Sequence, residues 1–76
     1  MMYTKLTTTE KYMIWFLYSY HDYRAKFLAK QLSYSEQTIF RTVRVIDQLD
    51  VDEVINAIGP ILSRMTATEW LEENVT

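Results

Sequence analysis

The sequence predicts an all-α fold, a small helical bundle that forms one domain over residues 1–76. The chain has 76 residues, of which 49% are hydrophobic and 24% charged, an ordinary mixture for a single small globular domain. One Gly and one Pro provide little of the turn chemistry that a many-stranded β fold needs. Apolar residues recur mainly at three- and four-residue spacing, which is typical of helices packed around a core.

The first helix is predicted from Thr7 to about Tyr20. Thr7 and Glu10 have the spacing of a capping box, in which each side chain bonds an unpaired backbone N–H group of the other residue. The stripe that follows on one face consists of Met13, Phe16, Leu17 and Tyr20. Neighbouring apolar residues widen this stripe over most of the circumference, which is typical of a central bundle helix or of a dimer contact.

A second and a third helix follow. Asp22 is a candidate N-cap for a helix over about 23–32. The residues on its inner side are Ala25, Leu28, Ala29 and Leu32. After a short turn, Ser35 is the expected N-cap of a helix over about 36–49. The buried seam predicted for that helix consists of Ile39, Val43, Ile46 and Leu49.

A fourth helix is predicted after Asp50. Asp50 and Glu53 repeat the capping-box spacing, with Asp in the place of Ser or Thr. We expect the helix to end or kink at the Gly59-Pro60 pair. A β-hairpin across 51–65 is the alternative, and we favour the helix because period-two alternation is missing.

The last segment shows a third capping-box spacing, at Thr66 and Glu69. It predicts a short final helix through about Glu73 that buries Trp70 and Leu71. We therefore assign 50–76 as an acidic helical segment, a candidate for dimerisation or for contact with a partner.

Charge is unevenly distributed along the chain. Residues 1–46 carry seven basic and three acidic groups, a net charge of +4, and residues 47–76 carry one basic and seven acidic groups, a net charge of −6. The two together give the overall −2. This pattern indicates two surfaces with different partners, and the alternative is that both are solvated faces.

Several classes of function are not expected. Without Cys and with a single His, the chain lacks the residues of a cysteine or histidine metal site. The group Asp50, Asp52 and Glu53 lacks the spacing of a calcium loop, and helix capping explains it better. His21 has no Ser or Cys nucleophile to serve, so we expect no enzyme and no catalytic, cofactor-binding or metal-binding residues.

The longest uncharged apolar run, 12–20, has nine residues. A membrane span needs roughly 20, so a cytoplasmic protein is expected.

One segment resembles a known family. Residues 28–46 read Leu-Ala-Lys-Gln-Leu-Ser-Tyr-Ser-Glu-Gln-Thr-Ile-Phe-Arg-Thr-Val-Arg-Val-Ile. Over 28–41 this is similar to the LA-x-x-L-x-x-S-x-x-T-I-x-R pattern in the helix-turn-helix of bacterial and phage transcription regulators. With the preceding helix, the resemblance covers a three-helix core over 7–49. The chain departs from the family at Ser33, where Gly with a positive φ is usual. It also turns acidic from Asp47, so a winged variant stays open but a DNA-contacting wing is not expected.

The resemblance implies that the third helix enters the major groove of DNA. The side chains expected at base edges are Gln37, Phe40, Arg41 and Arg44. Arg can bond guanine, Gln can bond adenine, and an aromatic ring can meet a thymine methyl group. The groups expected at phosphates are Arg24, Lys26, Lys30, Ser35 and Thr38. The alternative for each basic residue is a solvated helix face, and for Phe40 a place in the core.

We therefore expect a small transcriptional regulator, a dimeric repressor of phage, plasmid or bacterial type, that binds duplex DNA sequence-specifically. The alternative function is a protein-interaction module on the same scaffold. Such a module would bind and inhibit a host protein, such as RNA polymerase or a defence complex. Glu36 on the expected DNA face and the net negative charge both suit this alternative.

Overall fold

The computed structural model describes residues 6–75, and in this range α-helices joined by short loops are the regular structure of the chain. The helices are α1 (Thr8–Tyr20), α2 (Ala25–Leu32), α3 (Glu36–Asp47), α4 (Val51–Leu62) and α5 (Ala67–Glu73). No strand occurs among these residues, so the all-α class is confirmed for them and the hairpin alternative is wrong. Lys5, which we counted in the basic part of the chain, lies outside the described range.

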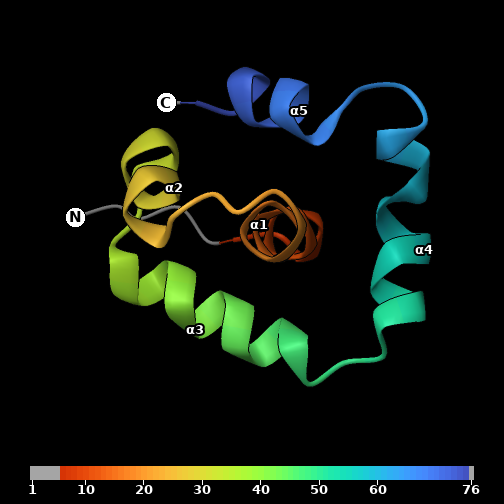
Figure 1. Ribbon diagram of the computed structural model, residues 1–76, viewed down its shortest axis with the longest axis horizontal. Coiled ribbons are helices and arrows are strands. Elements are labelled where there is room, and N and C mark those ends of the chain that lie inside the picture. The colour runs from red at the N-terminus through yellow and green to blue at the C-terminus, as the bar shows by residue number, and fades with distance from the viewer. Residues whose placement is uncertain (1–5, 76) are drawn as a thin grey trace.

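Helix α1 lies at the centre of the bundle, with the other four helices arranged around it (Figure 1). It packs against α3, α4 and α5. Met13, Ile14 and Leu17 have no exposed surface. Of the predicted stripe, Phe16 is only partly buried, and Tyr20 is 54% exposed because it is the last residue of α1, beyond the packed middle of the helix.

Two capping boxes form as the sequence predicts. In α1, the Glu10 N–H donates to Thr7 Oγ1 and the Thr7 N–H donates to Glu10 Oε1, both at 3.1 Å. In α5, Thr66 and Glu69 repeat this pattern at 2.8 and 3.1 Å. These local bonds fix where the two helices begin.

The start of α2 differs from the prediction. The N-cap is Arg24, whose side chain makes no capping bond, and the predicted N-cap Asp22 lies in the loop with a positive φ of 58°. The Tyr23 N–H donates back to the Leu17 carbonyl at 3.2 Å. Asp22 therefore ends α1 by reversing the chain, and it is not placed to cap α2.

The end of α3 also differs from the prediction. The helix ends at Asp47, and Leu49 is 38% exposed, so it does not belong to the buried seam. The Gln48 and Leu49 N–H groups bond carbonyls three residues back, at 3.2 and 3.0 Å. This tighter turn closes the helix and directs the chain toward Asp50, away from the core.

Helix α4 passes through the Gly59-Pro60 pair and ends at Leu62, so of the predicted end or kink at this pair the end is wrong. Proline removes only the bond to the Asn56 carbonyl, and Asn56 and Pro60 are both exposed, so water can reach this group. Asp50 caps α4 by accepting from the Asp52 N–H at 2.9 Å. The bond reaches Asp52 and not Glu53, so the predicted capping box is replaced by a simple N-cap.

The helices are short. Within residues 6–75, none has the length and apolar character that crossing a bilayer requires.

Candidate nucleic-acid interface

A three-residue turn joins α2 to α3, and Ser33 sets its geometry. Ser33 has φ 63° and ψ 42°, the left-handed conformation, and the following Tyr34 N–H donates to the Ala29 carbonyl at 2.9 Å. Ala29, Leu32 and Ile39 are buried beneath the turn. A serine thus adopts the backbone conformation that the family resemblance assigns to glycine.

The first turn of α3 carries two hydroxyl groups. Ser35 Oγ accepts from the Thr38 N–H at 3.1 Å and lies 2.9 Å from Thr38 Oγ1. Ser35 is exposed and Thr38 is partly exposed. Both hydroxyls therefore sit at the positive end of the α3 dipole, a favourable place for an anion.

The outward face of α3 is basic. Its buried face consists of Ile39, Thr42, Val43 and Ile46. At 3.6 residues per turn, Gln37, Arg41 and Arg44 lie on the opposite side, and all three are exposed. Among residues 6–75 we find no hydrogen bond or ion pair to these three side chains. They are therefore available to an external partner.

Phe40 lies at one edge of this face and is outside the core. It is 45% exposed, and its ring packs edge-to-face on Tyr18 of α1 with centroids 6.1 Å apart. Arg44 follows it by one helical turn. Phe40 is therefore an exposed aromatic side chain next to a basic one, supported on one side by α1.

Three cations lie on α2 and at its start. Arg24, Lys26 and Lys30 are exposed, whereas the opposite side of α2 is buried against the core. Because α2 packs directly on α3, these cations and the outward face of α3 belong to neighbouring elements. Of the residues assigned to phosphate and base contact, Arg24, Lys26 and Phe40 line one groove, and Lys30, Gln37, Arg41 and Arg44 do not line it.

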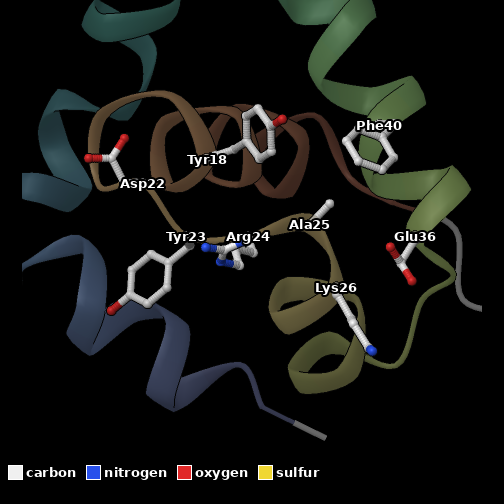
Figure 2. Close-up of a pocket in the computed structure, with 8 residues that line it drawn as sticks. All are labelled: Tyr18, Asp22, Tyr23, Arg24, Ala25, Lys26, Glu36 and Phe40. Atoms are coloured by element: carbon white, nitrogen blue, oxygen red, sulfur yellow. The ribbon is translucent and has the colours of Figure 1, made fainter.

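An open groove of about 570 Å³ lies between the end of α1, the start of α2 and the first half of α3 (Figure 2). It is lined by Tyr18, Asp22, Tyr23, Arg24, Ala25, Lys26, Glu36 and Phe40. The lining combines aromatic rings with both signs of charge. Sequence reasoning missed this groove because its walls come from three helices.

Two links that join α1 to α3 and to the turn before it were also missed. Trp15 Nε1 donates to Asp47 Oδ1 at 2.7 Å, and the Tyr34 hydroxyl donates to Glu10 Oε2 at 3.5 Å. Burial, the Glu10 charge and this hydrogen bond all raise the pKa of the Tyr34 hydroxyl. No sequence signal identifies these pairs, because 32 and 24 residues separate their members.

Many of the acidic residues lie on α4 and α5, where the exposed carboxylates are Asp52, Glu53, Glu69, Glu72 and Glu73. Helix α5 lies across α1 from α3 (Figure 1). The basic part also has exposed carboxylates, at Asp22, Glu36 and Asp47, so the charge asymmetry of the sequence becomes a partial separation in space.

Comparison of the chain with protein-family models, with curated proteins and with solved structures gives no match. Within the described part of the chain, no group of three or more His, Cys, Asp or Glu residues could hold a metal ion.

Proposed function

We propose that α2, the three-residue turn and α3 form a helix-turn-helix that binds duplex DNA, and that the protein regulates transcription. The observation that carries this proposal is the outward face of α3, where Gln37, Arg41 and Arg44 are exposed and have no partner within residues 6–75. The major groove is about 12 Å wide and accepts an α-helix. In this arrangement the two arginines reach guanine edges, Gln37 reaches adenine, and Phe40 contacts a thymine methyl group.

The surrounding groups suit the phosphate backbone. Ser35 and Thr38 lie at the start of α3, and the cations of α2 lie beside it. Contacts of this kind position a protein on DNA and make its affinity depend on salt. The net charge of −2 does not oppose this, because the exposed acids of the described residues lie mainly on α4 and α5.

The test is the fluorescence anisotropy of a labelled duplex, titrated with protein between about 50 and 200 mM salt. Affinity that falls steeply with salt supports phosphate contacts.

Arg41→Ala should weaken binding to a selected duplex by about 1–3 kcal/mol if Arg41 contacts a base. Arg64→Ala is the matched control, because Arg64 is exposed between α4 and α5 and the charge change is identical. Equal effects of the two variants would contradict the assignment of Arg41, and no binding at the lowest salt would contradict the function.

We further propose that the regulator acts as a dimer. Two copies of α3 would then meet successive major grooves about 34 Å apart. Sedimentation equilibrium measures the mass, and a monomer both free and on DNA would contradict this part of the proposal.

A second candidate function is a protein-interaction module that inhibits a host protein. The observation that favours it is the groove, where exposed Phe40 packs on Tyr18 and the two rings form an aromatic wall that a partner could cover. Under this alternative, Phe40→Ala abolishes binding to the partner, whereas Arg41→Ala leaves it intact. The DNA proposal expects Arg41→Ala to have the larger effect, so the pair of variants separates the two functions.

A further inference from the structure

One hydrogen bond connects the buried middle of α1 to the last turn of α3. Trp15 Nε1 donates to Asp47 Oδ1 at 2.7 Å. The indole is 3% exposed, whereas Asp47 is an exposed residue. The bond therefore runs from the core to the edge of the proposed DNA-binding helix, and its acceptor is a carboxylate, which strengthens it.

The place of Asp47 is unfavourable for a helix on its own. It is the last residue of α3, at the carboxyl end, where the helix dipole disfavours negative charge. Arg44 is the basic residue of that turn, and no ion pair joins it to Asp47 among residues 6–75. Helix formation therefore does not explain an acid at this position, whereas the bond to Trp15 does.

We propose that Trp15 and Asp47 are positioning residues whose hydrogen bond fixes the angle of α3 against α1. Arg41 and Arg44 are six and three residues before Asp47, so this bond also sets the direction in which they project. The effect of this bond on DNA recognition by the two arginines rests on the proposed DNA-binding function. Hydrogen bonds to base edges form only if α3 has a fixed orientation, whereas nonspecific attraction to phosphates requires only positive charge.

The link at the other end of α3 is weaker. The Tyr34 hydroxyl and Glu10 Oε2 are 3.5 Å apart, longer than the usual distance between two hydrogen-bonded oxygens. Tyr34→Phe is therefore an internal comparison. It should change the orientation of α3 much less than loss of the Asp47 carboxylate does.

The variants separate the bond from the charge. Asp47→Asn keeps an oxygen that can accept from the indole, and Asp47→Ala has none. Both remove one negative charge, so their electrostatic effects on DNA binding are equal. Because Asp47 lies at the surface, neither variant should prevent folding. Trp15→Phe removes the donor and keeps the charge, but it changes the core and is the secondary test.

The first measurement needs no DNA. Hydrogen exchange by NMR follows the Trp15 indole N–H and the backbone amides of residues 44–49, with the Trp70 indole as the reference. We expect exchange in Asp47→Ala to be about fivefold faster than in Asp47→Asn, the factor that a neutral hydrogen bond contributes, because the asparagine amide can accept from the indole but carries no charge. The Trp70 signal should not change. Equal exchange in Asp47→Ala and the unaltered protein would overturn the positioning role.

The second measurement compares affinity for a duplex selected from a random pool with affinity for an unselected duplex. We expect this ratio to be up to about fivefold lower for Asp47→Ala than for Asp47→Asn, because the two differ by one neutral hydrogen bond, with the same salt dependence in both. If hydrogen exchange differs between the two variants but their ratios of selected to unselected affinity are equal, the angle of α3 does not affect base recognition, and this part of the proposal is overturned. Absence of any DNA binding by the unaltered protein would contradict the proposed function instead, and hydrogen exchange would still decide the positioning role.

Discussion

At the scale of single residues, the unusual feature is left-handed backbone without glycine. Asp22 and Ser33 have φ values of 58° and 63°, and they lie at the two ends of α2. This conformation brings the Cβ atom close to the following carbonyl oxygen, and it costs L-residues other than glycine about 1–2 kcal/mol. Asp22 reverses the chain between α1 and α2, and Ser33 reverses it between α2 and α3, so the local cost is offset by packing of the helices.

The turn between α2 and α3 gives the first prediction. Ser33→Gly should be more stable than Ser33→Ala by about 1 kcal/mol, because both lack the hydroxyl and only Ala keeps a Cβ atom at positive φ. Urea denaturation measures the difference. At Ser63, where φ is −77° and ψ is −16°, the order should reverse. Greater stability of Ser33→Ala would contradict the left-handed turn.

The second prediction concerns Tyr34 at high pH. Burial, the Glu10 charge and the hydrogen bond to Glu10 raise the pKa of its hydroxyl above the ordinary value. A raised pKa in the folded state favours folding while the group is protonated. This stabilisation is complete below the ordinary value, near pH 10, and is lost as the pH rises through the raised value.

Chemical denaturation from about pH 8 to about pH 11 tests this, because the range runs from two units below the ordinary pKa of 10.0 to one unit above it. The difference in stability between the unaltered protein and Tyr34→Phe should shrink in the alkaline range, because the phenyl ring has no proton to lose. Tyr12→Phe is the control, because among residues 6–75 no hydrogen bond joins the Tyr12 hydroxyl to a carboxylate. A constant difference across the range would contradict the Tyr34–Glu10 interaction.

At the scale of elements, side-chain caps set the starts of α1, α3, α4 and α5, whereas the end of α4 does not follow its local signal. Its helix continues through Pro60 for two more residues, although proline usually ends a helix at the preceding residue. Val54 and Ile58 are fully buried on its inner face. Packing of this face holds the chain helical where the local sequence disfavours it.

The third prediction follows from this conflict. Pro60→Ala should stabilise the protein by about 1–3 kcal/mol, because alanine restores the bond to the Asn56 carbonyl and removes the ring clash. Pro60 is exposed, so little packing is lost. Thermal unfolding measures the effect, and Asn56→Ala controls for general gains in helix propensity. A lower midpoint for Pro60→Ala would show that proline has a role of its own in α4.

At the scale of the whole molecule, stability depends on one central helix, and charge is separated around it. Folded proteins of 76 residues are stabilised by about 4–11 kcal/mol in total. The core is built on α1, whereas the basic residues of α2 and α3 and the acids of α4 and α5 lie outside it. Changes in the core should therefore affect folding, and changes in the surface charges should affect partners.

The fourth prediction compares two leucines. Leu17→Ala on α1 should cost about 2–5 kcal/mol, because a fully buried side chain leaves a cavity. Leu49→Ala makes the same chemical change at a side chain that is 38% exposed, and it should cost well under half as much. Urea denaturation of both variants decides this. Similar costs would contradict the position of Leu49 outside the core.

The sequence by itself determined the features that depend on residues close together in the chain. The capping boxes of Thr7 and Thr66, the N-cap at Ser35 and the outward direction of Arg41 and Arg44 were predicted. Bonds across three residues and the 3.6-residue period of a helix are local, so the sequence contains all that they need.

The tertiary structure alone decided what depends on distant residues. The bond from Trp15 to Asp47, the exposure of Leu49, the support of Phe40 by Tyr18 and the passage of α4 through Pro60 all follow from how the helices pack. Local patterns could not predict these features, because each reflects a balance between a local preference and contacts made many residues away. The helical periodicity therefore identified the proposed DNA-binding face, and the packing on α1 set its orientation.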